Sequence, residues 1–328
     1  MYNAPEHSEA LHRWIEETLG SKQTRGDVIQ SLWSGYGSLE RLHFDGGGTA
    51  ILKRVAPPAD VDHPRGWNGS LGHARKLRSY EAECAFYARW ARECGDACRV
   101  PRALGINAHE GGWWMLLEDL DAAGFEGRPS HPSPAERDAC LRWLANFHAR
   151  FLGVAPDGLW PTGTYWHLAT RPDELRAMAE GPLRRFAADL DARLSSARFA
   201  TFVHGDAKVA NFCFGVDEVA AVDFQYAGGG CGMKDVAYFL SSVFSETECE
   251  AHAASCLDVY FHALRSAVPR SVDGDALEKE WRGLYPFAWA DFHRFLAGWA
   301  PSHAKVHGYT ARMSAEAIAT LGRALNAP

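Results

Sequence analysis

The residues best suited to chemistry lie close together in the second half of the sequence. A carboxylate, an ammonium group and a carboxamide fall within six residues at Asp206, Lys208 and Asn211, and a second carboxylate follows at Asp223. Phosphoryl transfer from a nucleotide uses such a set: one Asp orients or deprotonates the attacking hydroxyl, and an Asn and a second Asp hold the bridging magnesium. The spacing therefore predicts Asp206 as the base and the other two oxygen donors as magnesium ligands.

The neighbouring residues complete a predicted catalytic loop. The ammonium group of Lys208 can reach the γ-phosphate and offset the charge that develops during transfer. His204 opens the spacing H-x-D-x-K-x-x-N of a kinase catalytic loop, and D-F-Q at 223–225 stands where D-F-G is expected. We expect His204 to orient the loop by hydrogen bonding. Asp235 is expected to cap the start of a helix and to steady the same loop.

Strand-like runs surround these residues. Residues 199–203 precede the loop, residues 220–222 precede the second aspartate, and 212–214 can close a short hairpin through 215–218. Such a layout would gather the carboxylates and the asparagine around one metal ion. The competing interpretation is a solvated polar loop between two strands.

A glycine-containing segment upstream is placed where a nucleotide-binding loop would be. A strand is expected at 28–33, and Gly35, Gly37 and Ser38 lie between it and an alternating strand at 39–44. Backbone N–H groups can approach phosphates only where side chains are absent, so glycines suit such a loop. The motif alone is weak, and its position before a strand lysine is what favours phosphate binding.

That lysine is Lys53, on a predicted strand at 49–55. It is either an exposed residue of an alternating strand or the lysine that contacts the α- and β-phosphates. A predicted helix at 75–93 favours the second interpretation, because it carries Glu81 and Glu83, either of which can pair with the lysine.

Composition places few restrictions on function. The chain has 328 residues, 47% apolar and 23% charged, with a net charge of −7. This balance gives no basic surface for nucleic acid or anionic membrane. The eight cysteines lack metal-binding spacing, and no apolar run reaches membrane-spanning length. We expect no signal peptide, because the first residues lack a basic stretch followed by an apolar one. We expect reduced, mostly buried thiols, a cytoplasmic location, and no nucleic-acid, membrane or obligate protein partner.

After residue 122 the pattern becomes helical. Ser133 and Glu136 form a capping box for a helix that ends at Gly153 and carries His148, an expected core histidine. The aromatic residues Trp281, Tyr285 and Trp289 are spaced as a helical stripe, which is either helix core or a wall for the substrate. Asp291 and His293 are polar residues in this stripe. Other helices are expected near 8–19, 171–181, 183–196, 233–243, 246–268, 274–282, 285–298 and 311–326.

Three runs together resemble a known family. They are Lys76–Tyr87 (K-x-R-S-Y-x-x-E-x-x-F-Y), Leu116–Leu120 (L-x-E-D-L) and His204–Asn211 (H-G-D-x-K-x-x-N). The chain resembles the kinase-like phosphotransferase superfamily of aminoglycoside phosphotransferases and choline kinases, and most of all its ecdysteroid-kinase-like (CHK-type) branch. The matched motifs extend from about residue 33 to about residue 240.

The resemblance implies an α+β, bilobal protein-kinase-like fold. The N-lobe, 1–120, would hold an antiparallel sheet and a helix, and the C-lobe, 121–328, would be mainly helical. ATP and Mg²⁺ would be the cofactors. The family run favours Glu83 over Glu81 as the lysine partner. A buried strand is expected at 113–118, and the resemblance places the adenine-binding hinge at its end, near Glu118 and Leu120.

Departures from protein kinases favour a small acceptor. Gly205 stands where the common type has arginine, and eleven residues separate Asp223 from Asp235, too few for an activation segment that docks a peptide. The predicted function is an ATP- and Mg-dependent kinase for a choline-, sterol- or antibiotic-like alcohol. The alternatives are a regulatory, nucleotide-binding pseudokinase and an aminoglycoside- or macrolide-type antibiotic phosphotransferase.

Overall fold

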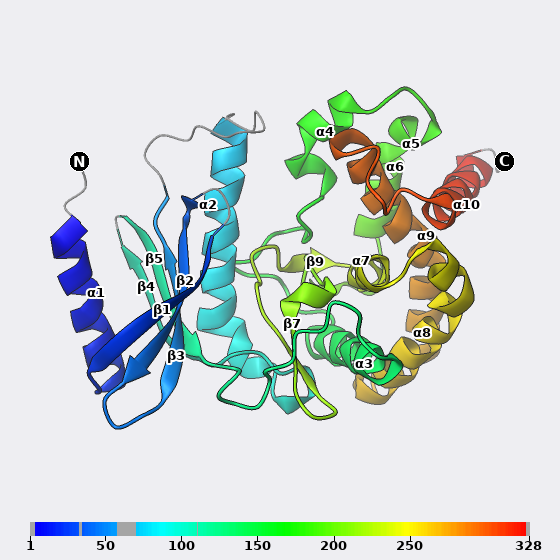
Figure 1. Ribbon diagram of the computed structural model, residues 1–328. Coiled ribbons are helices and arrows are strands. Elements are labelled where there is room, and N and C mark those ends of the chain that lie inside the picture. Colours follow the sequence, from blue (N-terminus) through cyan, green and yellow to red (C-terminus); the bar gives the residue numbers. More distant parts are fainter. Residues whose placement is uncertain (1–3, 33–34, 58–69, 110, 326–328) are drawn as a thin grey trace. The chain divides into compact units, whose positions relative to one another are not determined.

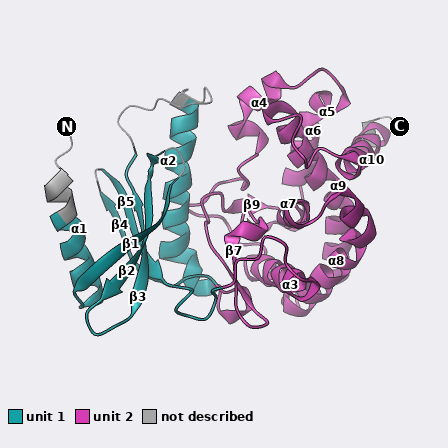
Figure 2. Cartoon of the chain, viewed as in Figure 1, with its two compact units in different colours: residues 1–93, 100–126 teal, residues 94–99, 127–328 magenta. Residues whose placement is uncertain are grey.

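The computed structural model describes residues 4–32, 35–57, 70–109 and 111–325 (Figure 1). The chain divides into two compact units, 1–93 with 100–126, and 94–99 with 127–328 (Figure 2). Segment 94–99 belongs with the second unit, because the carbonyl oxygen of Arg99 accepts hydrogen bonds from Trp143 Nε1 (2.9 Å) and from Ala221 N (3.0 Å). The division at residues 120/121, which separates nucleotide-binding from acceptor-binding parts, stays a prediction.

The first unit is built on a five-stranded antiparallel sheet with the order β1-β2-β3-β5-β4. The strands predicted at 39–44, 49–55 and 113–118 are confirmed. The edge strand β4 was not foreseen, and the strand predicted at 28–33 begins earlier, while Trp33 lies outside the described residues. The strands are β1 (Gln23–Ser31), β2 (Gly37–Phe44), β3 (Thr49–Val55), β4 (Ala103–His109) and β5 (Gly112–Glu118).

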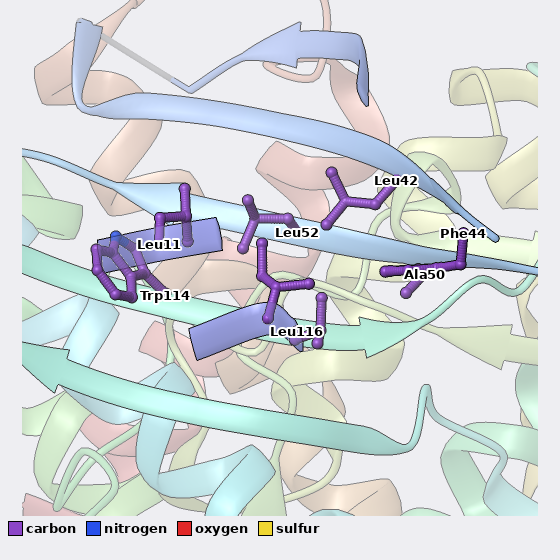
Figure 3. Close-up of a cluster of buried hydrophobic side chains, with 8 residues drawn as sticks. Leu11, Leu42, Phe44, Ala50, Leu52, Trp114 and Leu116 are labelled. Atoms are coloured by element: carbon purple, nitrogen blue, oxygen red, sulfur yellow. The ribbon is translucent and has the colours of Figure 1, made fainter. Parts of the chain in front are cut away.

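The apolar face of this sheet packs against helix α1 (Ala4–Leu19). Ala50 and Leu52 of β3 point into a buried cluster with Leu11 and Ile15 of α1, as Figure 3 shows for most of its members. Side chains alternate across a strand, so Lys53 must leave β3 on the opposite face. Pairing of Lys53 with Met115 and of Leu52 with Leu116 continues the same alternation on β5.

Helix α2 (Ser70–Ala85) lies on that opposite face in Figure 1, and the rings of Tyr80 and Trp113 on β5 are 6.2 Å apart. The prediction of one continuous helix to residue 93 is wrong. The α-helix gives way to a π-helix, η2 (Phe86–Trp90), and a 3₁₀ turn, η3 (Ala91–Glu93). Phe86 and Tyr87 are consecutive and both buried. The wider π turn accommodates two adjacent buried side chains, whereas the 3.6-residue spacing of apolar residues in the sequence does not predict such a turn.

The second unit is mainly helical and contains two small sheets. The hairpin of β7 and β8 and the pairing of β6 with β9 are antiparallel. Helix α3 starts with the predicted capping box of Ser133 and Glu136. The elements are η4 (Asp96–Cys98), α3 (Pro134–Arg150), η5 (Leu168–Thr170), α4 (Pro172–Ala177), α5 (Pro182–Arg185), α6 (Ala187–Ser195), β6 (Thr201–Val203), η6 (Val209–Asn211), β7 (Phe212–Phe214), β8 (Val219–Ala221), β9 (Gly228–Gly230), α7 (Met233–Val243), α8 (Glu246–Ala267), α9 (Gly274–Trp299) and α10 (Gly308–Leu325).

Three helix predictions need correction. The helices predicted at 274–282 and 285–298 form one helix, α9, which continues through the buried Pro286 because packing on both sides of the proline outweighs its missing N–H. The helix predicted at 183–196 is split into α5 and α6. The helix predicted at 171–181 already ends at Ala177. Short polar segments carry too little periodicity to set such ends.

The antiparallel-sheet unit and the mainly helical unit confirm the predicted α+β, bilobal kinase-like fold. All eight cysteines are free and buried, as expected. Within the described ranges, no helix combines the length and the apolar character needed to cross a bilayer.

Candidate active site

The loop after β6 brings three of the predicted site residues together. The carboxylate Oδ2 of Asp206 accepts hydrogen bonds from Lys208 Nζ (2.8 Å) and from Asn211 Nδ2 (3.1 Å). Asn211 Nδ2 also donates to the backbone oxygen of Asp206 at 2.8 Å. The loop is thus closed by its own side chains, and the base, the ammonium group and the carboxamide share one small volume.

Gly205 is required by the shape of this loop. Its φ is +80°, and a Cβ there would lie 2.1 Å from the backbone oxygen of Tyr226. No side chain fits at that distance, and a positive φ favours glycine. The glycine that stands in place of the protein-kinase arginine is therefore explained by close backbone packing.

Asp235 holds the backbone of the loop. It accepts hydrogen bonds from the N–H groups of His204 (2.5 Å, Oδ2) and Gly205 (2.9 Å, Oδ1), and from His148 Nε2 at 3.2 Å. His148 is fully buried and bonded through Nδ1 to Tyr260 Oη (2.7 Å), which confirms it as a core histidine. The prediction that Asp235 steadies the loop agrees with these bonds. The prediction that Asp235 caps a helix is wrong, because the N-cap of α7 is Gly232 and no side chain caps this helix.

Asp223 reaches the same place from the β7–β8 hairpin. Val222 N donates to the backbone oxygen of Asn211 at 2.9 Å, which ties the segment after β8 to the loop. Asp223 has φ +70°, a left-handed conformation that costs energy for a non-glycine residue and is concentrated at functional sites. Gln225, whose role the sequence did not indicate, donates to Asp223 Oδ1 at 2.7 Å and orients that carboxylate.

The charges of the loop shift one another. Burial raises the pKa of Asp206, Lys208 opposes this shift, and the negative charge of Asp223 adds to it. Burial lowers the pKa of Lys208, but the charge and hydrogen bond of Asp206, together with the charge of Asp223, outweigh burial, and the pKa is raised. Two carboxylates that repel each other beside one lysine leave an excess of negative charge, which a cation would relieve.

The donor set restricts which cation fits. No group of three or more His, Cys, Asp or Glu side chains suitable for a metal occurs in the described part of the chain. An ion here would need the amide oxygen of Asn211, since the side-chain hydrogen bonds to Asp206 use Nδ2. Amide and carboxylate oxygens completed by water and phosphate oxygens suit magnesium.

In the first unit, Lys53 pairs with Glu83. Lys53 Nζ lies 2.8 Å from Glu83 Oε1 and 2.7 Å from Oε2, and both side chains are buried. Glu81, the alternative partner, is exposed and 3.5 Å from Arg78. Strand alternation therefore places the lysine on the α2 face, where the predicted glutamate receives it.

The glycine-containing segment shows one strict requirement. Gly37 has φ +138°, and a Cβ there would lie 1.9 Å from the backbone oxygen of Arg54 on β3. Gly35 has φ +73° with open space around it. The hydroxyl of Ser38 donates to Glu40 Oε1 at 2.5 Å, so in this structure it is engaged within β2. Phosphate binding by these three residues stays a prediction.

The predicted hinge follows β5. The Glu118 carboxylate accepts a hydrogen bond from Arg102 N at 3.0 Å, which fastens β4 to β5. Arg41 Nε lies 2.7 Å from Asp119 Oδ2; burial opposes ionisation of Asp119, but bonds from Arg41 and Thr49 hold its pKa below the usual value. The carbonyl of Leu120 accepts from two backbone N–H groups, while its own N–H meets no acceptor among the described residues.

We predict that the buried Lys53–Glu83 pair separates stability from activity. Lys53→Met alone leaves a buried carboxylate without its charge partner and should lower the free energy of unfolding by about 3–5 kcal/mol. Adding Glu83→Met should recover most of this loss, because the pair is then replaced by apolar groups. Both variants should lack activity, because neither retains the Lys53 ammonium group.

Chemical denaturation and activity assays of the single and double variants check this prediction. Glu81→Met, in the same helix but exposed, is the control and should change neither quantity much. Equal stability losses for Glu81→Met and Lys53→Met would show that the pair is unimportant.

The aromatic stripe of α9 belongs to the helix core. Trp281, Tyr285 and Trp289 are buried, so the packing interpretation is confirmed for these three. Asp291 accepts bonds from Trp166 Nε1 (3.1 Å) and from Arg294 Nη2 (2.8 Å), and is fully buried. His293 Nδ1 is 2.8 Å from Ser314 Oγ. The two polar residues of the stripe are therefore engaged in contacts within the second unit.

Comparison with known proteins agrees with this geometry. The model of the phosphotransferase enzyme family matches residues 28–274. No curated protein matches the sequence significantly.

Among solved structures, an amicoumacin kinase (hAmiN), described as a complex with AMP-PNP, Ca²⁺ and Ami, is 13% identical, covers 96% of each chain and has a TM-score of 0.57. A protein assigned as a fructosamine-3-kinase, from Haemophilus somnus 129PT, is 12% identical, covers 95% of this chain and 96% of that chain, and has a TM-score of 0.50. At these identities the similarity concerns the fold. With the family model covering most of the sequence, this chain belongs to the phosphotransferase enzyme family.

Proposed function

We propose that the protein transfers the terminal phosphoryl group of ATP to a hydroxyl of a small molecule, with Mg²⁺ as the metal. The main support for this proposal is the geometry of Asp206. Lys208 and Asn211 hold its side chain, and Asp235 fixes the backbone of its loop. A fold shared with a kinase solved with AMP-PNP and Ca²⁺ supports the same classes of ligand here.

Each side chain of the loop has a chemical task. Asp206 would accept a hydrogen bond from the acceptor hydroxyl and take its proton late, since phosphoryl transfer passes through a loose transition state. Its raised pKa makes it a better proton acceptor than an exposed aspartate. Lys208 remains an ammonium group and would neutralise charge on the phosphoryl oxygens.

Asn211 and Asp223 would hold the metal. Bound Mg²⁺ would neutralise phosphate charge and orient the phosphates. Gln225 orients the Asp223 carboxylate through a 2.7 Å hydrogen bond to Oδ1.

The first unit would bind the nucleotide. Lys53, oriented by Glu83, would contact the α- and β-phosphates, and the glycine-containing segment would cover them. The backbone N–H of Leu120 would donate to adenine, since it meets no other acceptor in the described chain. Convergence of this set with Asp206 is part of the proposal.

The acceptor would be a small alcohol, because the eleven residues between Asp223 and Asp235 leave no segment that could dock a peptide. We assign the chain to the CHK-type branch on the Lys76–Tyr87 run. A regulatory pseudokinase is disfavoured, because each polar group of the loop is present and bonded.

Metal dependence tests the proposal. Chelation of Mg²⁺ should abolish ADP release, and Asp223→Asn should raise the Mg²⁺ concentration that gives half-maximal activity. The neutral amide is a weaker ligand for a hard cation. The measurement is ADP release against Mg²⁺ concentration, with Glu218→Gln in the exposed hairpin turn as the control. Activity in excess chelator, or an unchanged Mg²⁺ requirement of Asp223→Asn, would contradict it.

A further inference from the structure

Lys305 is a second lysine within the electrostatic reach of Asp206. It lies in the connection between α9 and α10, and its backbone is fixed at both ends of the residue. Its N–H donates to His303 Nδ1 at 3.1 Å, and its carbonyl accepts from Thr310 Oγ1 at 2.8 Å. The side chain therefore starts from an ordered backbone.

The ammonium group of Lys305 rests on aromatic faces. Nζ is 4.7 Å from the ring centroid of Tyr238 and 5.5 Å from that of Phe292. Burial lowers the pKa of Lys305 to about 8; the charge of Asp206 opposes this shift and that of Lys208 adds to it. Among the described residues, no carboxylate lies within ion-pair distance of Nζ, and no side chain or backbone group accepts a hydrogen bond from it. Three N–H donors thus remain for a ligand.

The same aromatic residues adjoin the catalytic loop. Tyr165 N donates to the carbonyl of Gly205 at 3.2 Å, and the rings of Tyr165 and Tyr238 are 5.6 Å apart. Burial raises the pKa of Tyr238 well above its ordinary value, and the charge of Asp206 adds to the shift. Tyr238 therefore has both the base and the Lys305 ammonium group as neighbours, which brings Lys305 close to the place where an acceptor hydroxyl would meet Asp206.

Building on the proposed function, we propose that the acceptor alcohol carries an anionic group, a carboxylate or an acidic ester, that pairs with Lys305. The ring of Tyr238 would contact the part of the acceptor between its hydroxyl and its anion. A charged hydrogen bond in partly buried surroundings is stronger than an exposed one, so this contact would select among alcohols.

The same geometry disfavours a cationic acceptor. Aromatic faces attract ammonium groups, as in choline recognition. Here the faces of Tyr238 and Phe292 already carry the chain's own ammonium group. A second cation would meet repulsion from Lys305 and Lys208 at once, which is a common way to reject a wrong ligand.

Matched sets of alcohols test the proposal. Each set contains one scaffold as the carboxylate, the methyl ester and the amine; the first is 4-(hydroxymethyl)benzoate, its methyl ester and 4-(hydroxymethyl)benzylamine, and aliphatic sets of increasing length follow. Binding is measured by ligand-observed NMR and transfer by ADP release. The variants are Lys305→Met, Lys305→Arg, Lys305→Glu and, as control, Lys279→Met at an exposed position of α9.

We expect the wild type to prefer the carboxylate over its ester by about tenfold or more in affinity and kcat/KM in at least one set. Lys305→Met should remove this preference, Lys305→Arg should keep it, and Lys305→Glu should shift it toward the amine. Lys279→Met should behave as the wild type.

Three results would overturn the assignment. The first is that the wild type binds the amine or the ester as tightly as the carboxylate in every set, or binds no carboxylate at all. Another is an equal loss for all three members of a set in Lys305→Met. The third is weaker nucleotide binding by Lys305→Met with unchanged selectivity, which would place the lysine on the transferred phosphoryl group. Failure of the proposed function has a different signature, because wild type and Asp206→Asn would then release ADP at equal rates.

Discussion

Asp206→Asn should lower kcat by about 10²- to 10⁴-fold, the usual contribution of a positioned general base, while the protein still binds Mg-ATP. The amide occupies the same volume but cannot take the proton of the acceptor hydroxyl. The nucleotide is expected to contact the metal ligands, the lysines and the first unit, so its affinity should change little.

The same substitution should stabilise the fold near neutral pH in the absence of metal. The pKa of Asp206 is raised in the folded state, chiefly by burial. A group with a raised folded pKa stabilises the protein below its unfolded pKa, about 4 for aspartate, and loses that contribution as the pH rises through the folded pKa. An uncharged amide keeps this contribution at all pH values. The difference in unfolding free energy between Asp206→Asn and the wild type should therefore be larger at pH 7 than at pH 4.

Denaturant unfolding at both pH values, together with kcat and nucleotide affinity, measures these effects. Asp217→Asn is the matched control, because it makes the same chemical change at an exposed residue of the β7–β8 turn. A variant that keeps its activity, or that loses nucleotide binding as severely as turnover, would remove Asp206 from the assigned role.

Asp235→Ala should cost about 3–5 kcal/mol of unfolding free energy. Its two carboxylate oxygens accept bonds from the backbone N–H groups of His204 and Gly205 and from His148, all within buried structure. Truncation leaves these three donors without an acceptor. Activity should fall as well, because the backbone that positions Asp206 is no longer held.

Urea unfolding followed by circular dichroism measures this cost. Asp189→Ala, at an exposed position in the first turn of α6, removes a helix-terminal carboxylate without a buried partner and should cost under about 1 kcal/mol. Asp235→Asn keeps one acceptor oxygen, so its cost in unfolding free energy should lie between those of the two alanine variants. It replaces Asp235→Ala in the comparison if that variant does not fold. Equal costs for Asp235→Ala and Asp189→Ala would show that the carboxylate does not hold the loop.

The parts of the site that follow from local spacing could be predicted from the sequence. His204 to Asn211 is one short loop, and a hairpin of fixed length returns the chain to Asp223, so their proximity needs no long-range information. Strand alternation likewise decides the face on which Lys53 lies. Helical periodicity alone does not distinguish Glu83 from Glu81, because both belong to one helix; the family run favours Glu83, and the structure pairs it with Lys53.

Features set by tertiary packing could not be predicted in this way. The π turn at Phe86 and the continuation of α9 through Pro286 both contradict local propensity and are held by burial. Lys305 lies in a connection without periodicity, and nothing in its neighbourhood along the chain indicates that Tyr238, far earlier in sequence, receives its ammonium group. Such contacts appear only when the helices are assembled.

The most direct test is detection of the transferred phosphate itself. The protein is incubated with Mg-ATP and a broad set of hydroxylated metabolites, amino alcohols, sterols, hydroxy acids and antibiotics, and products are examined by ³¹P NMR and mass spectrometry. We predict a new phosphate monoester of at least one alcohol with the wild type and none with Asp206→Asn. Formation of the ester at an equal rate by both proteins, or normal Mg-ATP binding without any ester, would contradict phosphoryl transfer at this loop.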